Sequence, residues 1–297
     1  MRIDALTLEG FRNYQRQQVL FDEHCNVIYG ENAQGKTNLL EAIVYLSCGK
    51  SPRTHADREL IGFEKQAAVL EGRINSRDRE FITRIELQRG RKRKMTVNGV
   101  TAKNAAALSD VLHTVFFAPE DLFLIRDGAA ARRRVMDNSL CQLRPRYAQA
   151  LAEYKRLHEH KTRILRDSEE KPSLLDTLDE FSLGMAKAGA VLIHYRAHFI
   201  KRLRQTAPEV HGDFSGGREQ LALHYETVST VLDPEASPRD ILPQLLEHQE
   251  SHRAAELAVR QCLSGPHKDD LVVEIDGNLA KSFASQGQTR TAALSLK

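Results

Sequence analysis

One motif constrains this chain more than any other feature: residues 30–37 match the phosphate-binding pattern G-x-x-x-x-G-K-[ST]. The matching residues are Gly30, Glu31, Asn32, Ala33, Gln34, Gly35, Lys36 and Thr37. The apolar run Asn26–Tyr29 predicts a strand before the motif, and apolar residues at helical spacing in 39–46 predict a helix after it. In such a strand-to-helix loop, backbone N–H groups and the helix N-terminus can surround a phosphate. A glycine-rich turn that binds nothing is the alternative, which the complete match and its flanks disfavour.

The chemistry of the motif predicts a nucleotide with β- and γ-phosphates as the ligand. Lys36 is expected to reach the β- and γ-phosphates, and the Thr37 hydroxyl is expected to ligate Mg²⁺. Many unrelated proteins bind nucleotides in this way, so the motif alone predicts an α/β nucleotide-binding fold and no particular activity.

Composition excludes several classes of protein. The 297 residues are 41% hydrophobic and 28% charged, which is typical of a soluble globular chain. No apolar run approaches the roughly 18–20 residues of a membrane span, and the start has no signal-peptide pattern. The four cysteines are far apart, so neither a zinc site nor a disulfide framework is expected. These features predict a cytoplasmic protein without a membrane association.

Periodicity predicts a β-rich beginning and a helical middle. Strands are expected at Ile3–Leu8, Ala67–Ile74, Glu80–Leu87 and Met95–Val97, with a hairpin turn at Asn98-Gly99, and later at Leu221–Tyr225 and Leu271–Ile275. Helices are expected over 129–166 with a start or kink at Pro145, over 173–206 up to Pro208, and over 238–263. We therefore predict three parts: a nucleotide-binding lobe over 1–128, a helical lobe over 129–264, and a segment 265–297 that returns to the first lobe.

A second short motif, Ser285-Gln286-Gly287-Gln288, precedes a predicted helix. Ser285 is a suitable N-cap, and Gln288 stands where a capping box requires it. A well-capped helix is therefore one interpretation. The other follows from a resemblance to the signature motif of ABC-type ATPases. In those proteins the serine, the glycine and the helix N-terminus bind the γ-phosphate of an ATP held by the partner subunit.

Taken together, six segments in one order resemble the RecF family of DNA-repair ATPases, which is related to the heads of SMC and Rad50 proteins. They are Leu6–Tyr14, Gly30–Ala42, Phe117–Leu122, Arg132–Asp137, Gly265–Leu271 and Ser285–Arg290. The resemblance covers nearly the whole chain. It implies an ABC-type ATPase head, a P-loop lobe with a mixed or antiparallel sheet, and an α-helical second lobe. Prolines within 129–264 exclude a sustained coiled coil.

The resemblance also implies a function. A member of this family would be an ATP-dependent DNA-binding recombination mediator that dimerises on ATP and binds duplex DNA near single-strand gaps. It would act with RecR and RecO, in RecA loading and the SOS response. Ser285, Gly287 and Gln288 would face the ATP of the partner subunit. Arg12 and Asn13 would approach the nucleotide, although a plain surface loop is the alternative.

Basic clusters are the candidate DNA contacts. Arg91, Lys92, Arg93 and Lys94 are consecutive cations in a predicted hairpin, where they could bind phosphates or simply be solvated. If they do not bind DNA, the helices with Arg132–Arg134 or Lys155–Arg166 are the next candidates. The pairs His194/His198 and His248/His252 lack a metal-site pattern, and His267–Asp270 is expected to have a structural or inter-lobe role.

One element of the resemblance has no counterpart in the printed sequence. The family places a Walker B strand with its acid, a D-loop and a switch histidine after the signature helix, where this sequence reaches Lys297. Leu271–Asp276 has a similar pattern at a different position and is interpreted as a strand before an Asp276-Gly277 turn. We therefore expect residues 1–297 to hydrolyse no ATP, whereas the full-length family would be weak DNA-dependent ATPases. A nucleotide-gated DNA-binding scaffold, or another SMC/Rad50-like head without useful hydrolysis, is the alternative function.

Overall fold

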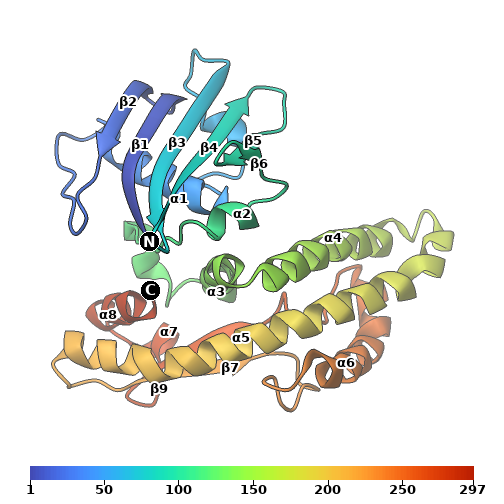
Figure 1. Cartoon of the computed structure of the whole chain (residues 1–297). Coiled ribbons are helices and arrows are strands. Elements are labelled where there is room, and N and C mark those ends of the chain that lie inside the picture. Colours follow the sequence, from blue (N-terminus) through green and yellow to red (C-terminus); the bar gives the residue numbers. More distant parts are fainter. The chain divides into compact units, whose positions relative to one another are not determined.

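The computed structural model describes residues 1–297, and its contacts divide the chain into two compact units, Met1–Phe116 and Phe117–Lys297 (Figure 1). This boundary lies earlier than the division after residue 128 that the sequence suggested. Residues 265–297 are grouped with the second unit. The three-part division and the return of this segment to the first lobe stay predictions, and the two units are described separately below.

The first unit is built on a six-stranded sheet in the order β2-β1-β3-β4-β5-β6, antiparallel throughout. Its strands are β1 (Arg2–Phe11), β2 (Tyr14–Leu20), β3 (Ala67–Ser76), β4 (Arg79–Gln88), β5 (Lys94–Val97) and β6 (Val100–Thr101). The helices are α1 (Lys36–Cys48) and the short α2 (Ala106–Ser109), with a 3-10 turn η1 at Asp57–Glu59. In Figure 1, α1 lies against one face of the sheet, and contacts with β3 and β4 hold it there.

Alternation along the strands explains which face α1 covers. Leu8 of β1 pairs with Leu70 of β3, Leu70 pairs with Ile85 of β4, and Ile85 pairs with Met95 of β5. All four side chains are buried in the core beside Leu46 of α1. Because successive side chains of a strand point to opposite faces, these four residues lie on the same side of the sheet. This apolar row packs against α1.

The predicted hairpin turn is confirmed. Asn98 and Gly99 connect β5 to β6, and both have positive φ angles, 49° and 77°. A tight turn of this kind favours asparagine followed by glycine, because both central residues are in the left-handed region. The predicted strands at 3–8, 67–74, 80–87 and 95–97 also correspond to β1, β3, β4 and β5.

Two expectations for the first unit were wrong. β2 was not predicted, because its mostly polar residues gave no apolar pattern; it is an edge strand that pairs with β1 alone. The strand expected at 26–29 is absent, and Val27 and Tyr29 are exposed. A strand needs a hydrogen-bonding neighbour, and no strand of the structure pairs with this segment.

The second unit is mostly helical, with a three-stranded antiparallel sheet in the order β7-β8-β9. Its helices are α3 (Ala129–Leu143), α4 (Pro145–Asp167), α5 (Leu178–Ser215), α6 (Pro238–Val259), α7 (Ala280–Phe283) and α8 (Gln286–Leu296), with 3-10 turns η2 (Pro119–Phe123) and η3 (Pro172–Thr177). The strands are β7 (Leu221–Glu226), β8 (Asp270–Ile275) and β9 (Asn278–Leu279). The long helix α5 packs against α4, α6, β7 and α8 (Figure 1).

Proline had different effects in two helices of this unit. Pro145 begins α4, as expected, because a proline at the first helical position removes an N–H that would have no partner. Pro208 was expected to end α5, but it lies inside the helix, which continues to Ser215. The end comes at Gly216, whose φ of 65° is left-handed and whose N–H donates to the Gly212 carbonyl. No helix of the chain combines the length and the apolar character needed to cross a lipid bilayer.

Candidate nucleotide-binding site

The predicted phosphate loop forms the turn into α1. Gly30, Ala33 and Gly35 have φ angles of 142°, 66° and 102°, and α1 begins at Lys36. Glycine is required at 35, since a Cβ atom there would lie 2.7 Å from the amide group of Asn13 in a left-handed backbone. No side chain caps the helix, and its first internal hydrogen bond comes from the Leu39 N–H to the Gly35 carbonyl. The N–H groups before Leu39 are therefore placed to bind an anion.

The Lys36 ammonium group lies over the loop. Its Nζ donates to the carbonyl oxygens of Gly30 (2.7 Å) and Glu31 (2.6 Å). These are neutral acceptors, so the charge of Lys36 has no anionic partner in the chain. The Thr37 side chain is exposed beside it in the first turn of α1. The loop thus presents a cation, a hydroxyl and helix N–H groups to one region, which is the chemistry of a triphosphate site.

Asn13 connects the end of the first strand to the phosphate loop. Its Nδ2 donates to the Gln34 carbonyl (3.2 Å), and its Oδ1 accepts from the Asn38 Nδ2 (2.8 Å). Tyr14 adds a hydrogen bond from its hydroxyl to the Gly35 carbonyl (3.1 Å). The structure therefore brings the predicted residue Asn13 into contact with the loop, while its direct contact with a nucleotide stays a prediction.

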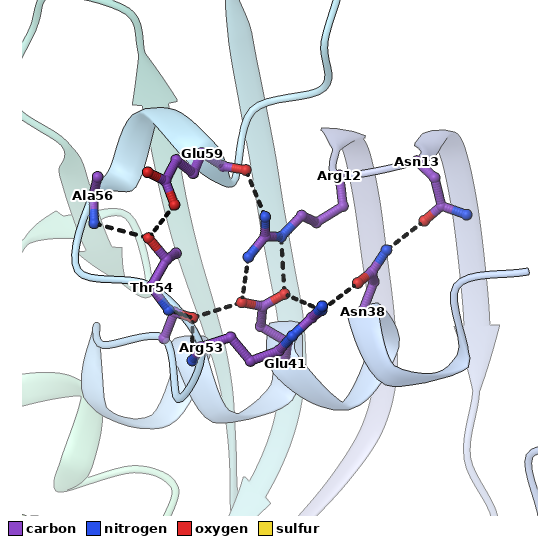
Figure 2. A network of polar contacts seen from close by, with 9 residues as sticks. Arg12, Asn13, Asn38, Glu41, Arg53, Thr54, Ala56 and Glu59 are labelled. Atoms are coloured by element: carbon purple, nitrogen blue, oxygen red, sulfur yellow. Dashed lines mark hydrogen bonds and ion pairs between the residues drawn. The ribbon is translucent and has the colours of Figure 1, made fainter. Parts of the chain in front are cut away.

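Arg12 has a different environment from the one expected. Its guanidinium donates through Nε and Nη2 to the two carboxylate oxygens of Glu41 (2.9 and 2.7 Å), and through Nη1 to the Glu59 carbonyl (2.8 Å), as Figure 2 shows. The side chain of Glu41 is 0% exposed, and such a buried carboxylate needs a cationic partner. Arg12 therefore supports the fold of the site, and its approach to the nucleotide stays a prediction.

Sequence reasoning missed Glu41, Ser51 and Arg53. The Ser51 hydroxyl donates to Glu41 Oε1 (2.5 Å). Arg53 Nη1 lies 2.8 Å from Asn38 Oδ1 and 3.4 Å from Glu41 Oε2 (Figure 2). One signal could have identified Glu41: it stands four residues before Tyr45, so both lie on the same face of α1, which is buried. A carboxylate on an apolar helix face indicates a buried ion pair.

The motif Ser285–Gln288 forms the predicted capping box. The Gln288 N–H donates to Ser285 Oγ (3.2 Å), and the Ser285 N–H donates to Gln288 Oε1 (2.8 Å). Both side chains therefore cap α8, and Gly287 lies in its exposed first turn. The capped helix is confirmed. Contact of these residues with the nucleotide of a partner subunit stays a prediction.

The predicted DNA-contact cluster separates into two kinds of residue. Arg91, Lys92 and Lys94 are exposed. Arg93 is turned inward: Nη1 donates to the Gly49 carbonyl (2.6 Å) and to the Tyr45 hydroxyl (3.1 Å), and it lies 3.4 Å from Asp57. Burial raises the pKa of that Tyr45 hydroxyl. Arg93 thus holds α1 to the hairpin, and we no longer regard it as a DNA contact.

The alternative basic cluster at 132–134 is also largely structural. Arg132 is buried and makes a two-pronged ion pair with Asp270, at 2.7 and 2.8 Å. Arg133 donates to the Asp269 carbonyl (2.6 Å), which leaves only Arg134 exposed. A surface that binds DNA in this unit would therefore need residues outside the cluster 132–134.

The expected structural role of 267–270 agrees with the contacts in the second unit. Asp269 is buried and accepts from Arg196 Nη1 (2.8 Å), Thr227 Oγ1 (2.8 Å) and the Tyr225 hydroxyl. Burial raises the pKa of Asp269. His267 Nδ1 forms a hydrogen bond with the Tyr154 hydroxyl (2.7 Å). Burial lowers the pKa of His267 to about 4. No group of three or more His, Cys, Asp or Glu side chains could hold a metal ion.

Comparisons with known proteins decide the family. The chain is 36% identical to "DNA replication and repair protein RecF" of Agathobacter rectalis over 297 residues, covering 100% of this chain and 79% of the relative. The protein with the same description from Acetivibrio thermocellus is also 36% identical, with 80% of its length covered. This chain belongs to the RecF family.

Structures agree with the RecF assignment. A solved structure described as the recombination mediator protein RecF-ATPrS in the RecFOR pathway is 28% identical, with a TM-score of 0.93 over 99% of this chain and 79% of that one. A family model described as "AAA domain" matches residues 5–180. An Smc head domain from Pyrococcus furiosus, 16% identical, has a TM-score of 0.52 over 99% of this chain and 77% of that one. RecF and SMC heads therefore share the fold, which confirms the ATPase-head prediction.

Proposed function

We propose that this chain is an ATP-dependent DNA-binding recombination mediator of DNA repair. The observation that carries the proposal is Lys36, whose ammonium group lies over the phosphate loop with only carbonyl oxygens as partners. Membership in the RecF family supports a role in DNA replication and repair, and a relative solved as RecF-ATP, 29% identical, supports ATP as the ligand.

In this proposal the phosphate groups of ATP replace the carbonyl partners of Lys36. The N–H groups of the first turn of α1 bind the same phosphates, because the helix begins without a side-chain cap. Thr37 is exposed in that turn, so its hydroxyl is free to be one ligand of Mg²⁺. When bound, the ion would neutralise charge on the phosphates, with Thr37 as the ligand that this proposal assigns to it.

ATP binding is proposed to join two copies of the chain. Ser285, Gly287 and Gln288 of one copy would meet the γ-phosphate bound by the other. The capping box supports this role, because it fixes the start of α8 and leaves that turn exposed. An anion at this terminus would be stabilised by the helix dipole.

The dimer is proposed to bind duplex DNA near single-strand gaps, in the cytoplasm. Arg91, Lys92 and Lys94 are exposed cations on one hairpin, suited to phosphate contacts. The family assignment supports RecR and RecO as partners, with RecA loading and the SOS response downstream, and the relative described in the RecFOR pathway supports the same partners.

Light scattering with and without ATP tests the proposal. The chain should become dimeric only with ATP, Lys36→Ala should stay monomeric, and Ser285→Arg should bind ATP but stay monomeric. Ser173→Arg is the matched control, since Ser173 is exposed far along the chain from the motif. Ser285→Arg protein that still dimerises on ATP would leave only the capping role for this motif.

A further inference from the structure

An exposed aromatic side chain stands two residues before the capped start of α8. Phe283 is the last residue of the short helix α7 and is 73% exposed. Leu279, at the other end of α7, is 46% exposed. The Cα atom of Ser285 lies within about 8 Å of the Cα atom of Phe283, because two peptide links join them. An apolar surface therefore borders the motif Ser285–Gln288.

The backbone that carries Phe283 is held on both sides. Ala280 of α7 is buried in the core of the second unit, where α7 contacts β8. The Ala284 N–H donates to the Ala280 carbonyl (3.2 Å), and the Ala284 carbonyl accepts from Arg126 Nη2 (3.4 Å). The capping box then fixes Ser285. Phe283 thus projects from an ordered segment, so covering it with another surface would cost little conformational entropy.

The neighbours of Phe283 indicate the charge of the surface that would cover it. Lys281 and Arg290 are both exposed, and neither forms an ion pair with a carboxylate. Exposed aromatic rings are enriched at protein interfaces, and one ring buries about 150–250 Å² when it is covered. An apolar anchor flanked by two cations suits a surface that combines apolar area with negative charge.

The phosphate-loop face of the first unit gains these properties when ATP is bound. Glu31 of the loop is exposed, and its carboxylate has no cationic partner. Phe63 is 97% exposed and lines a groove with Asn13, whose Nδ2 bonds the Gln34 carbonyl of the loop. Four arginines line the same groove, so it repels cations until the phosphates of ATP are present. With ATP, this face offers both negative charge and an exposed ring.

We propose that Phe283 is an apolar anchor of the ATP-dependent dimer and packs against Phe63 in the groove of the second copy. The inference rests on the proposed function, because it uses the approach of Ser285 to the nucleotide of that copy. In a two-fold dimer the contact forms twice. Ser285, Gly287 and Gln288 would contact the phosphate, whereas Phe283 adds apolar burial beside it.

A tryptophan at position 283 tests this burial directly, since the chain contains no tryptophan. The emission of Phe283→Trp should move to shorter wavelength with ATP, and the change should grow with protein concentration. Phe214→Trp, at a phenylalanine of α5 that is 57% exposed, should show no change. A change that is independent of protein concentration, or a dimer whose Phe283→Trp emission stays that of an exposed ring, would overturn the proposal.

Analytical ultracentrifugation at saturating ATP measures the size of the effect. Phe283→Ala should weaken the dimer about 100-fold, because two contacts worth about tenfold each are lost. Its ATP affinity should not change, and Phe214→Ala should dimerise like the unchanged chain. Adding Phe63→Ala to Phe283→Ala should cause little further loss, since both changes remove the same contact. Losses that multiply would contradict the pairing of the two rings.

Ser285→Arg separates this inference from the proposed function. If Ser285→Arg abolishes the dimer while Phe283→Ala dimerises like Phe214→Ala, only the role of Phe283 fails. If Ser285→Arg and Phe283→Ala both dimerise normally on ATP, the dimer forms through another surface and both proposals fail. An unchanged chain that stays monomeric with ATP would refute the proposed dimer and, with it, the anchor.

Discussion

At the scale of single residues, neighbouring arginines with the same charge have opposite roles. Arg91 is exposed, whereas Arg93, two positions later, enters the interior and bonds Gly49, Tyr45 and Asp57. Charge patterning in the sequence identified the cluster but not this difference. It depends on tertiary partners: the Tyr45 hydroxyl and the Asp57 carboxylate are within reach of Arg93, whereas Arg91 lies in the exposed turn between β4 and β5.

Arg93→Ser should therefore destabilise the first unit. The Gly49 carbonyl and the Tyr45 hydroxyl would lose a donor at a half-buried position, so we expect a loss of about 1–3 kcal/mol in the free energy of unfolding. Arg91→Ser is the matched control and should change the stability by less than about 0.5 kcal/mol. Urea denaturation measures both, and equal stabilities would show that Arg93 has no structural role.

At the scale of elements, sequence periodicity predicted most strands and helices, and turn chemistry predicted the hairpin at Asn98-Gly99 and the turn at Asp276-Gly277. The failures have physical causes. β2 is an edge strand whose polar residues carry no apolar signal, and Pro208 is accommodated inside α5 because packing along that helix outweighs a local break. The segment 26–29 has an apolar pattern but no pairing partner in the structure.

The basic hairpin should show its role in the salt dependence of DNA binding. Replacing Arg91, Lys92 and Lys94 by serine, with Arg93 kept to preserve the fold, should weaken binding similarly for all sequences. Each lost phosphate contact should reduce the slope of log K against log[salt] by about 0.9 on duplex DNA. Arg79→Ser is the control at a different turn. An unchanged slope would move the DNA surface to another part of the chain.

The loop before β8 should make the second unit sensitive to acid. Folded His267 has a pKa of about 4, below its ordinary value of 6.5, so the unfolded chain takes up a proton first as the pH falls. The neutral His267 of the folded protein therefore contributes to stability in full above pH 6.5. This contribution is lost as the pH falls from 6.5 towards 4. Between pH 7 and pH 5, we expect the free energy of unfolding to fall by about 2 kcal/mol. His267→Gln should largely abolish this fall. An equal loss in both proteins would contradict this origin, and His24→Gln, at an exposed histidine, is the control.

At the scale of the whole molecule, the sequence contains two helix starts that we propose as anion-binding sites, in different units. The first, at α1, has no side-chain cap and has Lys36 beside it; the second, at α8, is capped by Ser285 and Gln288. Motif and family resemblance predicted both. The network of Glu41, Ser51 and Arg53 was not predicted, because it depends on contacts between α1 and the following loop that no local pattern reports.

The affinity of the chain for ATP tests the central claim most directly, measured by titration with a fluorescent ATP analogue. Lys36→Ala should reduce that affinity about tenfold or more, because a charge-assisted phosphate contact contributes roughly 1.5–3 kcal/mol. Lys103→Ala, at an exposed lysine in the same unit, should bind like the unchanged chain. Equal affinities of Lys36→Ala and Lys103→Ala would contradict the assignment of residues 30–37 as the ATP site.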